Sequence, residues 1–510
     1  MRTVNVIRNS GYALGSFAFT ALLALAVRKF FTMYLSVELL GVEGLFSGII
    51  SVLSLAEMGL SSIISYGLYK ELANNNRREI NTLMNIYRQI YAMIGVFVAV
   101  VGFVLFFFLP YIIRSTTLPW SYIQFAYVIQ IGAVLSGYFL AYKRTLLTAD
   151  QKDYVCIQVD TTCTLLNNIC RVVAIVFFQS YILYAGFGLV FNVVANMIIA
   201  RRVKSQYPFL HSIKVTFEDI RERRFFKDIK NLLIQRFGFF LYGGTDSIFI
   251  SGFLGLHIAG LFANYQTIHS QIFSIMYKAL QGIVPSIGNL VYADDKEKRW
   301  RVFEMLDFVY ILFGAYIASI YAIIFQPFIK LFFGSSFVLP ECVILVLAAY
   351  VFLMIQFENL CNFRSAVGFF ERDRNWIVLS GLVKVAAAVP LISLFDVAGL
   401  VFAGAISWCF IGIGRLQIVF EKIFVDKSKK KYLLRHLLGS ILVMIEISIC
   451  YVIFQWSGYN QNLIQLTISG VILMLGMTVL HLIFFHQARE FPIAVSYLKN
   501  TIHALRRREH

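Results

Sequence analysis

Long apolar stretches, separated by short polar segments, make up most of the chain. Each stretch holds about 20 residues or more, the length that a helix needs to cross the hydrocarbon core of a bilayer. Fourteen such spans are predicted, at residues 10–36, 45–68, 84–109, 121–141, 155–178, 181–200, 231–253, 258–290, 302–326, 340–361, 376–395, 397–420, 436–456 and 462–486. The pattern therefore predicts an all-α polytopic membrane protein with fourteen transmembrane helices.

Composition and charge agree with this prediction and add an orientation. Only 14% of the residues are charged, whereas soluble proteins carry roughly 25%. Of the 45 Lys and Arg residues, 35 lie in segments predicted to be cytoplasmic, Arg144 and Arg364 among them, and only Arg114 and Lys330 lie in outer segments. This excess of cations on one side predicts that both termini are cytoplasmic. The net charge of +17 is therefore no sign of a nucleic-acid partner.

The longest internal hydrophilic segment, residues 201–230, divides the first twelve spans into two sets of six. We expect an N-terminal six-helix bundle in residues 1–200 and a C-terminal one in residues 231–425, joined by this cytoplasmic linker. Two additional transmembrane helices follow in residues 426–487, and a basic amphipathic tail in residues 488–510. A short echo between LGVEGLF (Leu40–Phe46) and LGLHIAGLF (Leu254–Phe262), which open spans two and eight, favours two pseudo-symmetric halves.

Ionisable side chains inside the predicted spans are the candidate functional residues. A charge at the bilayer centre costs at least about 2.5–3.5 kcal/mol, so it faces protein or water. The candidate cations are Arg28, Lys29, Arg171, Arg236, Lys278 and Lys384, and the candidate anions are Glu57, Asp160 and Asp246. Amide side chains at helical spacing near them are Asn167, Asn168, Asn264 and Gln271. A helix face that carries polar side chains together with an ionisable residue favours a water-filled cavity, and hydrogen bonding between helices is the alternative. Arg415, near a span end, is expected to extend its charge towards the interface.

Other features limit the chemistry. The seven cysteines contain no CxxC pair, so neither a disulfide framework nor a metal site is indicated. Membrane glycosyltransferases and polysaccharide polymerases typically need a sizeable outer loop with acidic or histidine residues. The predicted outer loops are short and contain no histidine. A transporter rather than an enzyme is therefore expected, without a cofactor, and the enzymes stay as the alternative from a different class.

Four segments, in chain order from the first predicted span to the end of the second, form a sequence pattern. They are Arg28 with Phe30–Phe31, then Glu38–Phe46, Leu53–Ser62 and Leu68–Lys70. This pattern resembles the opening of the bacterial polysaccharide repeat-unit flippases, a family of the multidrug/oligosaccharidyl-lipid/polysaccharide exporter superfamily. The layout of six, six and two spans is also similar to that family. Ser36 and Val42–Glu43 depart from the residues that are commoner there.

The resemblance implies a MATE-like fold, with two six-helix bundles around a central cavity. It also implies a flippase that moves undecaprenyl-diphosphate-linked oligosaccharides, the repeat units of O-antigen or capsule, to the outer leaflet of the bacterial cytoplasmic membrane by alternating access. Its partners would be this substrate, membrane lipids and polysaccharide assembly proteins. Arg28 and Lys29 are the first candidates for the anionic diphosphate. Glu57 is the first candidate for a coupling proton or sodium ion.

Two alternatives lie within the same superfamily. A multidrug or cation antiporter would carry cationic substrates, which suit spans with eight cations against seven anions poorly. A peptidoglycan lipid-precursor flippase is the other alternative, and only the pattern between Arg28 and Lys70 speaks against it.

The predicted topology can be tested by labelling, after the native cysteines have been replaced. A cysteine at Ser457 is expected to react with a membrane-impermeant thiol reagent added outside, and a cysteine at Ser428 is not, because the two positions flank one predicted span. Labelling of the Ser428 variant from outside would contradict the fourteen-span map.

Overall fold

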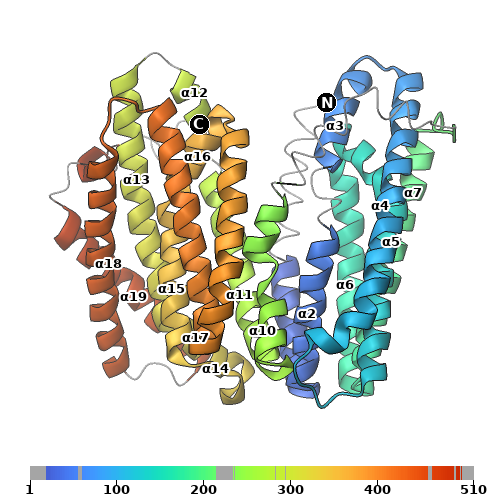
Figure 1. Ribbon diagram of the computed structural model, residues 1–510, viewed down its shortest axis with the longest axis horizontal. Coiled ribbons are helices and arrows are strands. Elements are labelled where there is room, and N and C mark those ends of the chain that lie inside the picture. Colours follow the sequence, from blue (N-terminus) through green and yellow to red (C-terminus); the bar gives the residue numbers. More distant parts are fainter. Residues whose placement is uncertain are drawn as a thin grey trace. The chain divides into compact units, whose positions relative to one another are not determined.

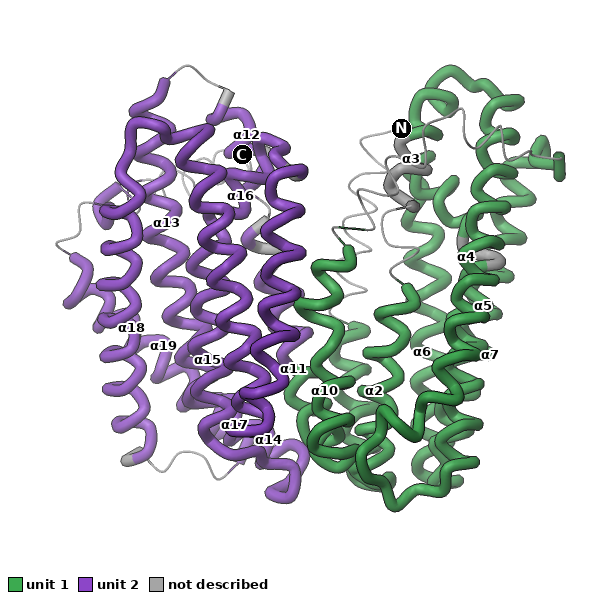
Figure 2. Tube along the Cα trace, in the orientation of Figure 1, with its two compact units in different colours: residues 1–268 green, residues 269–510 purple. Residues whose placement is uncertain are grey.

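The computed structural model describes residues 19–54, 60–213, 234, 236–281, 283–292, 295–457, 462–486, 490–493 and 496. These residues form helices joined by short turns, and no strand occurs among them. They belong to two compact units, residues 1–268 and residues 269–510 (Figure 2). The predicted all-helical fold is therefore confirmed.

Unit 1 is a bundle of helices built around α5. Within it α5 packs against α3, α4 and α7, and α6 packs against α7. The unit begins with a helix at residues 19–34. Its further helices are α2 (Val37–Leu53), α3 (Leu60–Ala73), α4 (Arg77–Ile112), α5 (Trp120–Ala149), α6 (Asp153–Phe178), α7 (Tyr181–Gln206), a helix at residues 236–243, α10 (Asp246–Phe253) and the first part of α11 (Leu256–Gln281) (Figure 1).

Unit 2 is built around α15, which packs against α13 and α17. Its elements after α11 are α12 (Val284–Tyr292), α13 (Lys296–Ser319), the π-helical turn η2 (Ile320–Phe325), α14 (Gln326–Phe333), the 3₁₀ turn η3 (Ser335–Phe337), α15 (Glu341–Gln356), α16 (Glu358–Val367), α17 (Phe370–Lys422), α18 (Lys429–Ser457) and α19 (Leu463–Phe485). An aromatic cluster joins α13, α16, α17 and α18. Phe303 is fully buried, and its ring lies edge-on to Phe363, 5.0 Å between centroids, a geometry that aromatic pairs favour.

Membrane spans can be compared with the sequence prediction. Eight helices of the described part of the chain are long and apolar enough to cross a membrane, or nine if the bent α5 counts as one span. α17 counts once among them, although it covers two predicted spans. Four other predicted spans are interrupted by a turn or lie partly outside the described residues: 10–36, 45–68, 231–253 and 258–290. The chain is a multi-pass membrane protein, and the exact count of fourteen spans stays a prediction.

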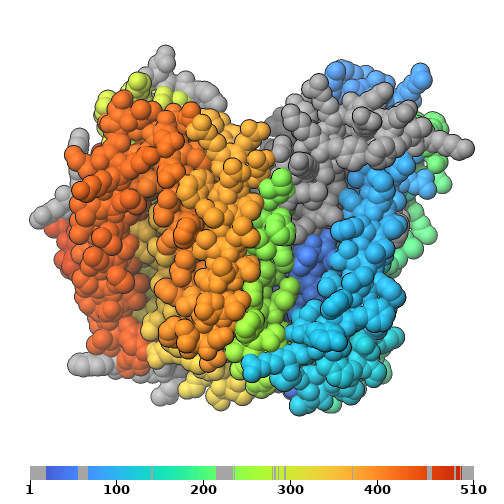
Figure 3. Space-filling model, viewed as in Figure 1, coloured from blue at the N-terminus to red at the C-terminus, as the bar shows by residue number. Residues whose placement is uncertain are grey.

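The two arms of α17 form a hairpin. Phe395 (φ −131°, ψ 16°) and Asp396 (φ 50°, ψ −134°) depart from helical geometry. The Ser407 hydroxyl donates a hydrogen bond of 2.7 Å to the Ser380 carbonyl, 27 residues away, which requires the arms to run antiparallel. Figure 3 shows the side chains of the two arms, in shades of orange, in contact. The predicted boundary between spans eleven and twelve coincides with this reversal.

The outer face of α4 is apolar. Phe97, Phe103 and Phe107 are 58%, 66% and 58% exposed, a surface suited to lipid rather than to water. α4 has 36 residues and is therefore about 54 Å long, well beyond the roughly 30 Å of the hydrocarbon core. Its polar first turns consequently extend past the hydrocarbon.

Two glycines allow α2 and α11 to cross at close range within unit 1. A Cβ at Gly41 would lie 2.1 Å from the carbonyl oxygen of Leu256, and a Cβ at Gly260 would lie 2.0 Å from that of Val37. Val37 and Leu256 are the first residues of their helices, and each glycine lies four residues further on. The contact is therefore reciprocal, and it joins the two segments whose sequences echo each other. Close approach at small residues is typical of helix packing in membranes.

The predicted domain boundaries have no direct counterpart here. The two compact units meet inside α11, between Ile268 and His269, rather than at the hydrophilic segment 201–230, of which residues 214–230 lie outside the described part of the chain. Most of the predicted amphipathic tail, residues 488–510, lies outside it as well. The division into two six-helix bundles, a linker, two additional helices and a tail stays a prediction.

The crossing of α2 and α11 can be tested with alanine. Gly41→Ala and Gly260→Ala each place a methyl group against a backbone carbonyl, which cannot rotate away, so each is expected to lower the free energy of unfolding by about 1–3 kcal/mol. The measurement is equilibrium unfolding of the purified protein in mixed detergent micelles. Gly186→Ala in α7 is the control, because a Cβ there meets nothing within 4 Å. Equal stability of all three variants would contradict the close crossing.

Candidate functional site

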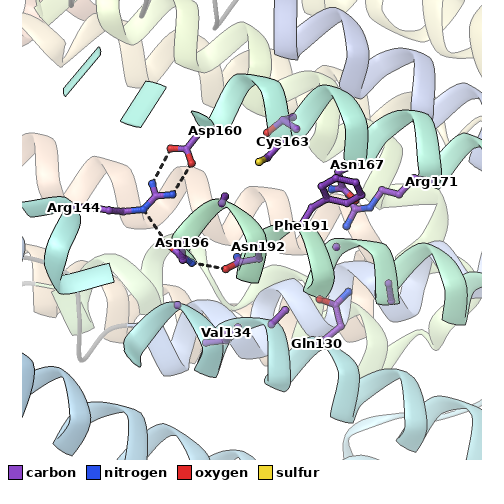
Figure 4. Close-up of a pocket in the computed structure, with 16 residues that line it drawn as sticks. Gln130, Val134, Arg144, Asp160, Cys163, Asn167, Arg171, Phe191, Asn192 and Asn196 are labelled. Carbon is purple, nitrogen blue, oxygen red and sulfur yellow. Dashed lines mark hydrogen bonds and ion pairs between the residues drawn. The ribbon is translucent and has the colours of Figure 1, made fainter. Parts of the chain in front are cut away.

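A cavity of about 650 Å³ lies between α5, α6 and α7 of unit 1. Its walls carry four amide side chains and three charged ones. The amides are Gln130, Asn167, Asn192 and Asn196, and the charged residues are Arg144, Asp160 and Arg171. Figure 4 shows Arg144 and Asp160 at one end of the cavity and Arg171 at the other. Amides can donate and accept hydrogen bonds, so these walls suit a polar, hydroxyl-rich ligand.

The charge at one end of the cavity is neutralised. The guanidinium of Arg144 donates to both carboxylate oxygens of Asp160, at 2.7 and 2.5 Å. Its Nε donates to Oδ1 of Asn196 at 3.0 Å, and Nδ2 of Asn196 donates to Oδ1 of Asn192 at 2.8 Å. A bidentate pair with a fixed third contact holds the arginine in one geometry, so this end of the cavity is rigid and close to neutral.

Arg171, at the other end, keeps its charge. Its Nε donates to the Tyr184 carbonyl at 3.3 Å, and its guanidinium carbon lies 4.3 Å from the centre of the Tyr184 ring. Among the described residues no carboxylate forms an ion pair with it. The side chain lies across α7 at Gly188, where a Cβ would be 2.5 Å from Nη2. Glycine at that position therefore makes room for the one cavity cation without a carboxylate partner among these residues.

A buried chain of polar contacts leads away from Arg171. The Tyr184 hydroxyl donates to Oε1 of Glu43 at 2.8 Å, and Nη1 of Arg28 donates to Oε2 of Glu43 at 2.6 Å. Nε of Arg28 donates to Oδ1 of Asn264 at 2.7 Å. The chain thus connects α6, α7, α2, the helix at residues 19–34 and α11. This ion pair is largely buried, with 10% of the Arg28 side chain and 21% of the Glu43 side chain exposed, and the further hydrogen bonds to both residues make such burial acceptable energetically.

Aromatic rings shield the polar chain from lipid. Phe31, which is fully buried, meets the rings of Tyr181 and Tyr184 edge-on, with centroids 6.0 and 5.2 Å apart. The two tyrosine rings stack on each other at 5.7 Å. The Tyr181 hydroxyl accepts from Nε2 of Gln130 at 3.4 Å, which returns the network to the cavity wall.

The structure brings part of the predicted site together. Asp160, Asn167 and Arg171 line one cavity, and Arg28 is hydrogen-bonded to Asn264. Asn168 is buried in α6 without lining that cavity. Three residues are half-buried in unit 1: Lys29, Arg236 and Asp246. Gln271 and Lys384 belong to unit 2, and Glu57 and the side chain of Lys278 lie outside the described residues.

Three arginines have carboxylate partners that the sequence analysis did not predict. Arg144 and Arg364 were expected in cytoplasmic loops, and Arg415 at the interface. Arg144 lies in α5 and pairs with Asp160, as described above. Arg364 and Arg415 are both buried and reach Asp373, which is fully buried, at 2.9 and 3.2 Å. The sequence places charges along the chain but does not reveal which opposite charge the fold brings to them.

Two buried histidine–carboxylate contacts attach the last two helices to unit 2. Nε2 of His436 in α18 lies 2.8 Å from Oδ2 of Asp307 in α13. Further along α18, Glu446 lies 3.1 Å from Nε2 of His481 in α19. All four side chains are less than 5% exposed. These contacts give α18 and α19 a polar attachment that the apolar sequence pattern does not reveal.

Sequence reasoning overlooked Glu43, which links Arg28 to Tyr184. It was noted only as a departure from the flippase pattern, at the bend before span two. A carboxylate at that unusual position was the available signal, because a buried arginine 15 residues earlier needs a counter-charge. Glu57 was considered instead, since it lies nearer the middle of a predicted span.

The Arg28–Glu43 pair can be tested by a double-mutant cycle. Glu43→Gln is expected to lower the free energy of unfolding by about 3–5 kcal/mol, because it leaves the buried Arg28 charge unpaired. Arg28→Met is expected to cost less, because the side chain of Glu43 is 21% exposed. The double variant is expected to lose much less than the sum. The exposed pair of Arg372 and Glu421, 3.9 Å apart, is the control, with a coupling of about 0–1 kcal/mol. Additive losses at Arg28 and Glu43 would refute the pairing.

No protein-family model and no curated protein matches this sequence. Among solved structures, the chain is similar to the lipid II flippase MurJ in an inward closed conformation. The two share 13% identity with a TM-score of 0.67, over 93% of this chain and 98% of that one. An inward-facing multidrug resistance MATE family transporter of the MOP superfamily is similar at 12% identity and a TM-score of 0.58, over 78% and 94%. The chain therefore has the fold that these two structures share.

Proposed function

We propose that this protein is a flippase that moves undecaprenyl-diphosphate-linked oligosaccharide repeat units from the cytoplasmic to the outer leaflet of a bacterial cytoplasmic membrane. The observation that carries the proposal is the α5–α7 cavity. It combines a row of amides with Arg171, which has no carboxylate partner among the described residues. Lipid-linked repeat units of the O-antigen or capsule class carry phosphates, which the arginine would bind, and sugar hydroxyls, which the amides would bind.

The chemistry of the cavity matches such a headgroup. A guanidinium can donate two parallel hydrogen bonds to a phosphate, and the bond is stronger in a dry site than in water. The amide side chains of Asn167, Asn192 and Gln130 offer donors and acceptors to sugar hydroxyls. Oδ1 of Asn167 is buried and accepts no hydrogen bond within the described part of the chain, so a ligand hydroxyl would satisfy it. The lipid tail would remain in the bilayer.

The likeness to the lipid II flippase supports a second candidate substrate. A peptidoglycan lipid precursor also joins a lipid to a diphosphate and sugars, and the same walls would accept it. A multidrug or cation antiporter fits less well, because the cavity carries two arginines and one carboxylate. The proposal of a carrier rather than a polysaccharide polymerase or glycosyltransferase is supported by the fold, since both structures compared above are transporters by name.

Coupling to an ion is a further part of the proposal. Export of an anionic headgroup is favoured by an inside-negative potential, by about 2.3 kcal/mol per charge per 100 mV, and an inward proton or sodium ion would add to this. Asp160 is the least suited of the candidate anions, because Arg144 occupies both of its oxygens. Glu57 and Asp246 remain the proposed coupling residues.

The cavity assignment can be tested by substrate binding. Arg171→Ala is expected to weaken the binding of an undecaprenyl-diphosphate-linked oligosaccharide about 10–100-fold, because a hydrogen-bonded charge is lost. Arg171→Lys is expected to lie between alanine and the native protein, since lysine keeps the charge but not the planar fork. The measurement is the dissociation constant in detergent, with flipping in proteoliposomes as the second readout.

Arg201→Ala is the matched control, because Arg201 is exposed at the end of α7 and does not line the cavity. Unchanged binding in Arg171→Ala, with normal folding, would refute the cavity as the headgroup site. Binding of a peptidoglycan precursor in preference to repeat-unit substrates would decide for the second candidate. If Arg171→Ala weakens the binding of the diphosphate-linked substrate but not the binding of undecaprenyl monophosphate, Arg171 is assigned to the diphosphate.

A further inference from the structure

A second cavity, of about 260 Å³, lies in unit 1 beside the segment that follows α7. α4 contributes Arg88, α5 contributes Lys143 and α7 contributes Lys204, and residues 210–212 close the remaining side. None of the described residues that line this cavity is acidic. It shares no lining residue with the α5–α7 cavity. By the predicted topology it opens towards the cytoplasm.

Three like charges line this small space, with Lys143 half-buried and Arg88 and Lys204 exposed to solvent. Both Arg88 and Lys204 lie close enough to Lys143 to repel its charge. The three residues come from three different helices, so their proximity is a product of the fold and not of a basic run in the sequence. Cations held together cost Coulomb energy that a bound anion would offset.

Two carboxylates close to Lys143 in the sequence, Asp150 and Asp153, are engaged elsewhere. Asp150 lies 2.7 Å from Nζ of Lys152 and accepts a hydrogen bond of 2.6 Å from the Tyr207 hydroxyl. Burial, together with this hydrogen bond, raises the pKa of Tyr207, so the hydroxyl stays a donor. Asp153 accepts from the Thr148 hydroxyl at 2.8 Å. Neither carboxylate lines the cavity of the three cations.

The wall formed by residues 210–212 is fixed by α4. Oδ1 of Asn81 accepts from the His211 N–H at 2.9 Å, and Nδ2 of Asn85 donates to the His211 carbonyl at 2.9 Å. Oδ1 of Asn85 accepts from the Ile213 N–H at 3.3 Å. Two asparagines one turn apart thus bind the backbone of the passing segment, which shapes the cavity in advance of any ligand.

We propose that this cavity binds a phosphate-bearing anion, either the headgroup of an anionic lipid in the adjoining leaflet or free phosphate. Arg88 supplies a guanidinium, and the two lysines supply point charges, the pair of chemistries that proteins use for phosphate. The Ser212 hydroxyl, which accepts from Arg88 at 3.1 Å, has its own proton to donate. The proposal does not rest on the carrier function proposed above, and its readout is binding rather than transport.

The experiment must separate a built site from the general attraction of cytoplasmic cations to anionic lipid. The variant Arg88→Gln/Lys143→Gln/Lys204→Gln removes the three cavity charges. The variant Arg78→Gln/Arg201→Gln/Arg202→Gln removes three exposed charges, also on α4 and α7, that do not line the cavity. The two variants have the same net charge, so bulk electrostatics affects them equally.

Each protein is titrated in detergent with phosphatidylglycerol, with phosphatidylcholine and with inorganic phosphate, and binding is followed by thermal stabilisation and native mass spectrometry. Phosphatidylglycerol is expected to bind the native protein and the exposed-charge variant, and the cavity variant about a hundredfold more weakly. Stabilisation by phosphatidylglycerol alone identifies a lipid headgroup, and stabilisation by inorganic phosphate as well identifies a general phosphate site.

Equal losses in the two triple variants would overturn the proposal, because the attraction would then be diffuse. Equal binding of phosphatidylcholine and phosphatidylglycerol by the native protein, with no effect of phosphate, would overturn it too. Should the cavity variant not fold, Lys143→Gln takes its place. About a tenfold loss is expected for that single variant and near-native binding for Lys143→Arg, whereas unchanged binding in Lys143→Gln would count against the site.

Discussion

The close crossing of α2 and α11 is the constraint on which the centre of unit 1 depends. Only glycine at positions 41 and 260 lets the two backbones approach so near. Asn264 lies one turn beyond Gly260, and Glu43 two residues beyond Gly41, so the crossing delivers both partners to Arg28. From Glu43 the contacts continue through Tyr184 to the cavity. The helix crossing at these two glycines thus positions the charged residues of the whole network.

Buried charges in both units follow one physical rule. A charge that is removed from water is tolerated when an opposite charge and further hydrogen bonds surround it. Asp373 in unit 2 meets two arginines, and Arg28 in unit 1 meets Glu43 and Asn264. Arg171, which is half-buried and lines the cavity, differs from these residues, with an aromatic face and a carbonyl in place of a carboxylate. A departure from an otherwise consistent pattern is what function tends to require.

Hydropathy and the cation distribution predicted the helical, membrane-spanning class, because both depend on composition over windows of about 20 residues. They also placed the reversal of α17 at residue 396. The ion-pair partners of the charged residues could not be predicted in this way. The pairing of Arg144 with Asp160, and of Arg28 with Glu43, depends on helix rotation and crossing, which a single sequence does not encode in any local pattern. Asp160, Asn167 and Arg171 were found because spacing on one helix is a local property.

The glycines likewise divide into those that a sequence pattern pointed to and those whose role depends on the tertiary structure. The echo between Leu40–Phe46 and Leu254–Phe262 was visible in the sequence, and the structure places these two segments against each other. Gly188, in contrast, lay in no repeated pattern. Its role depends on a guanidinium that reaches it from the neighbouring helix, and only the assembled fold reveals that approach.

The reversal inside α17 has a consequence for biosynthesis. Because only Phe395 and Asp396 separate its arms, α17 is expected to enter the membrane as one helical hairpin, with both arms together. Asp373, at the start of the first arm, meets Arg415 only after 42 further residues have been made. Arg364 precedes Asp373 in the sequence and lies 2.9 Å from it in the fold, so it is the counter-charge available before Arg415 has been made. The order of the three residues along the chain thus provides Asp373 with one arginine before it and a second arginine after it.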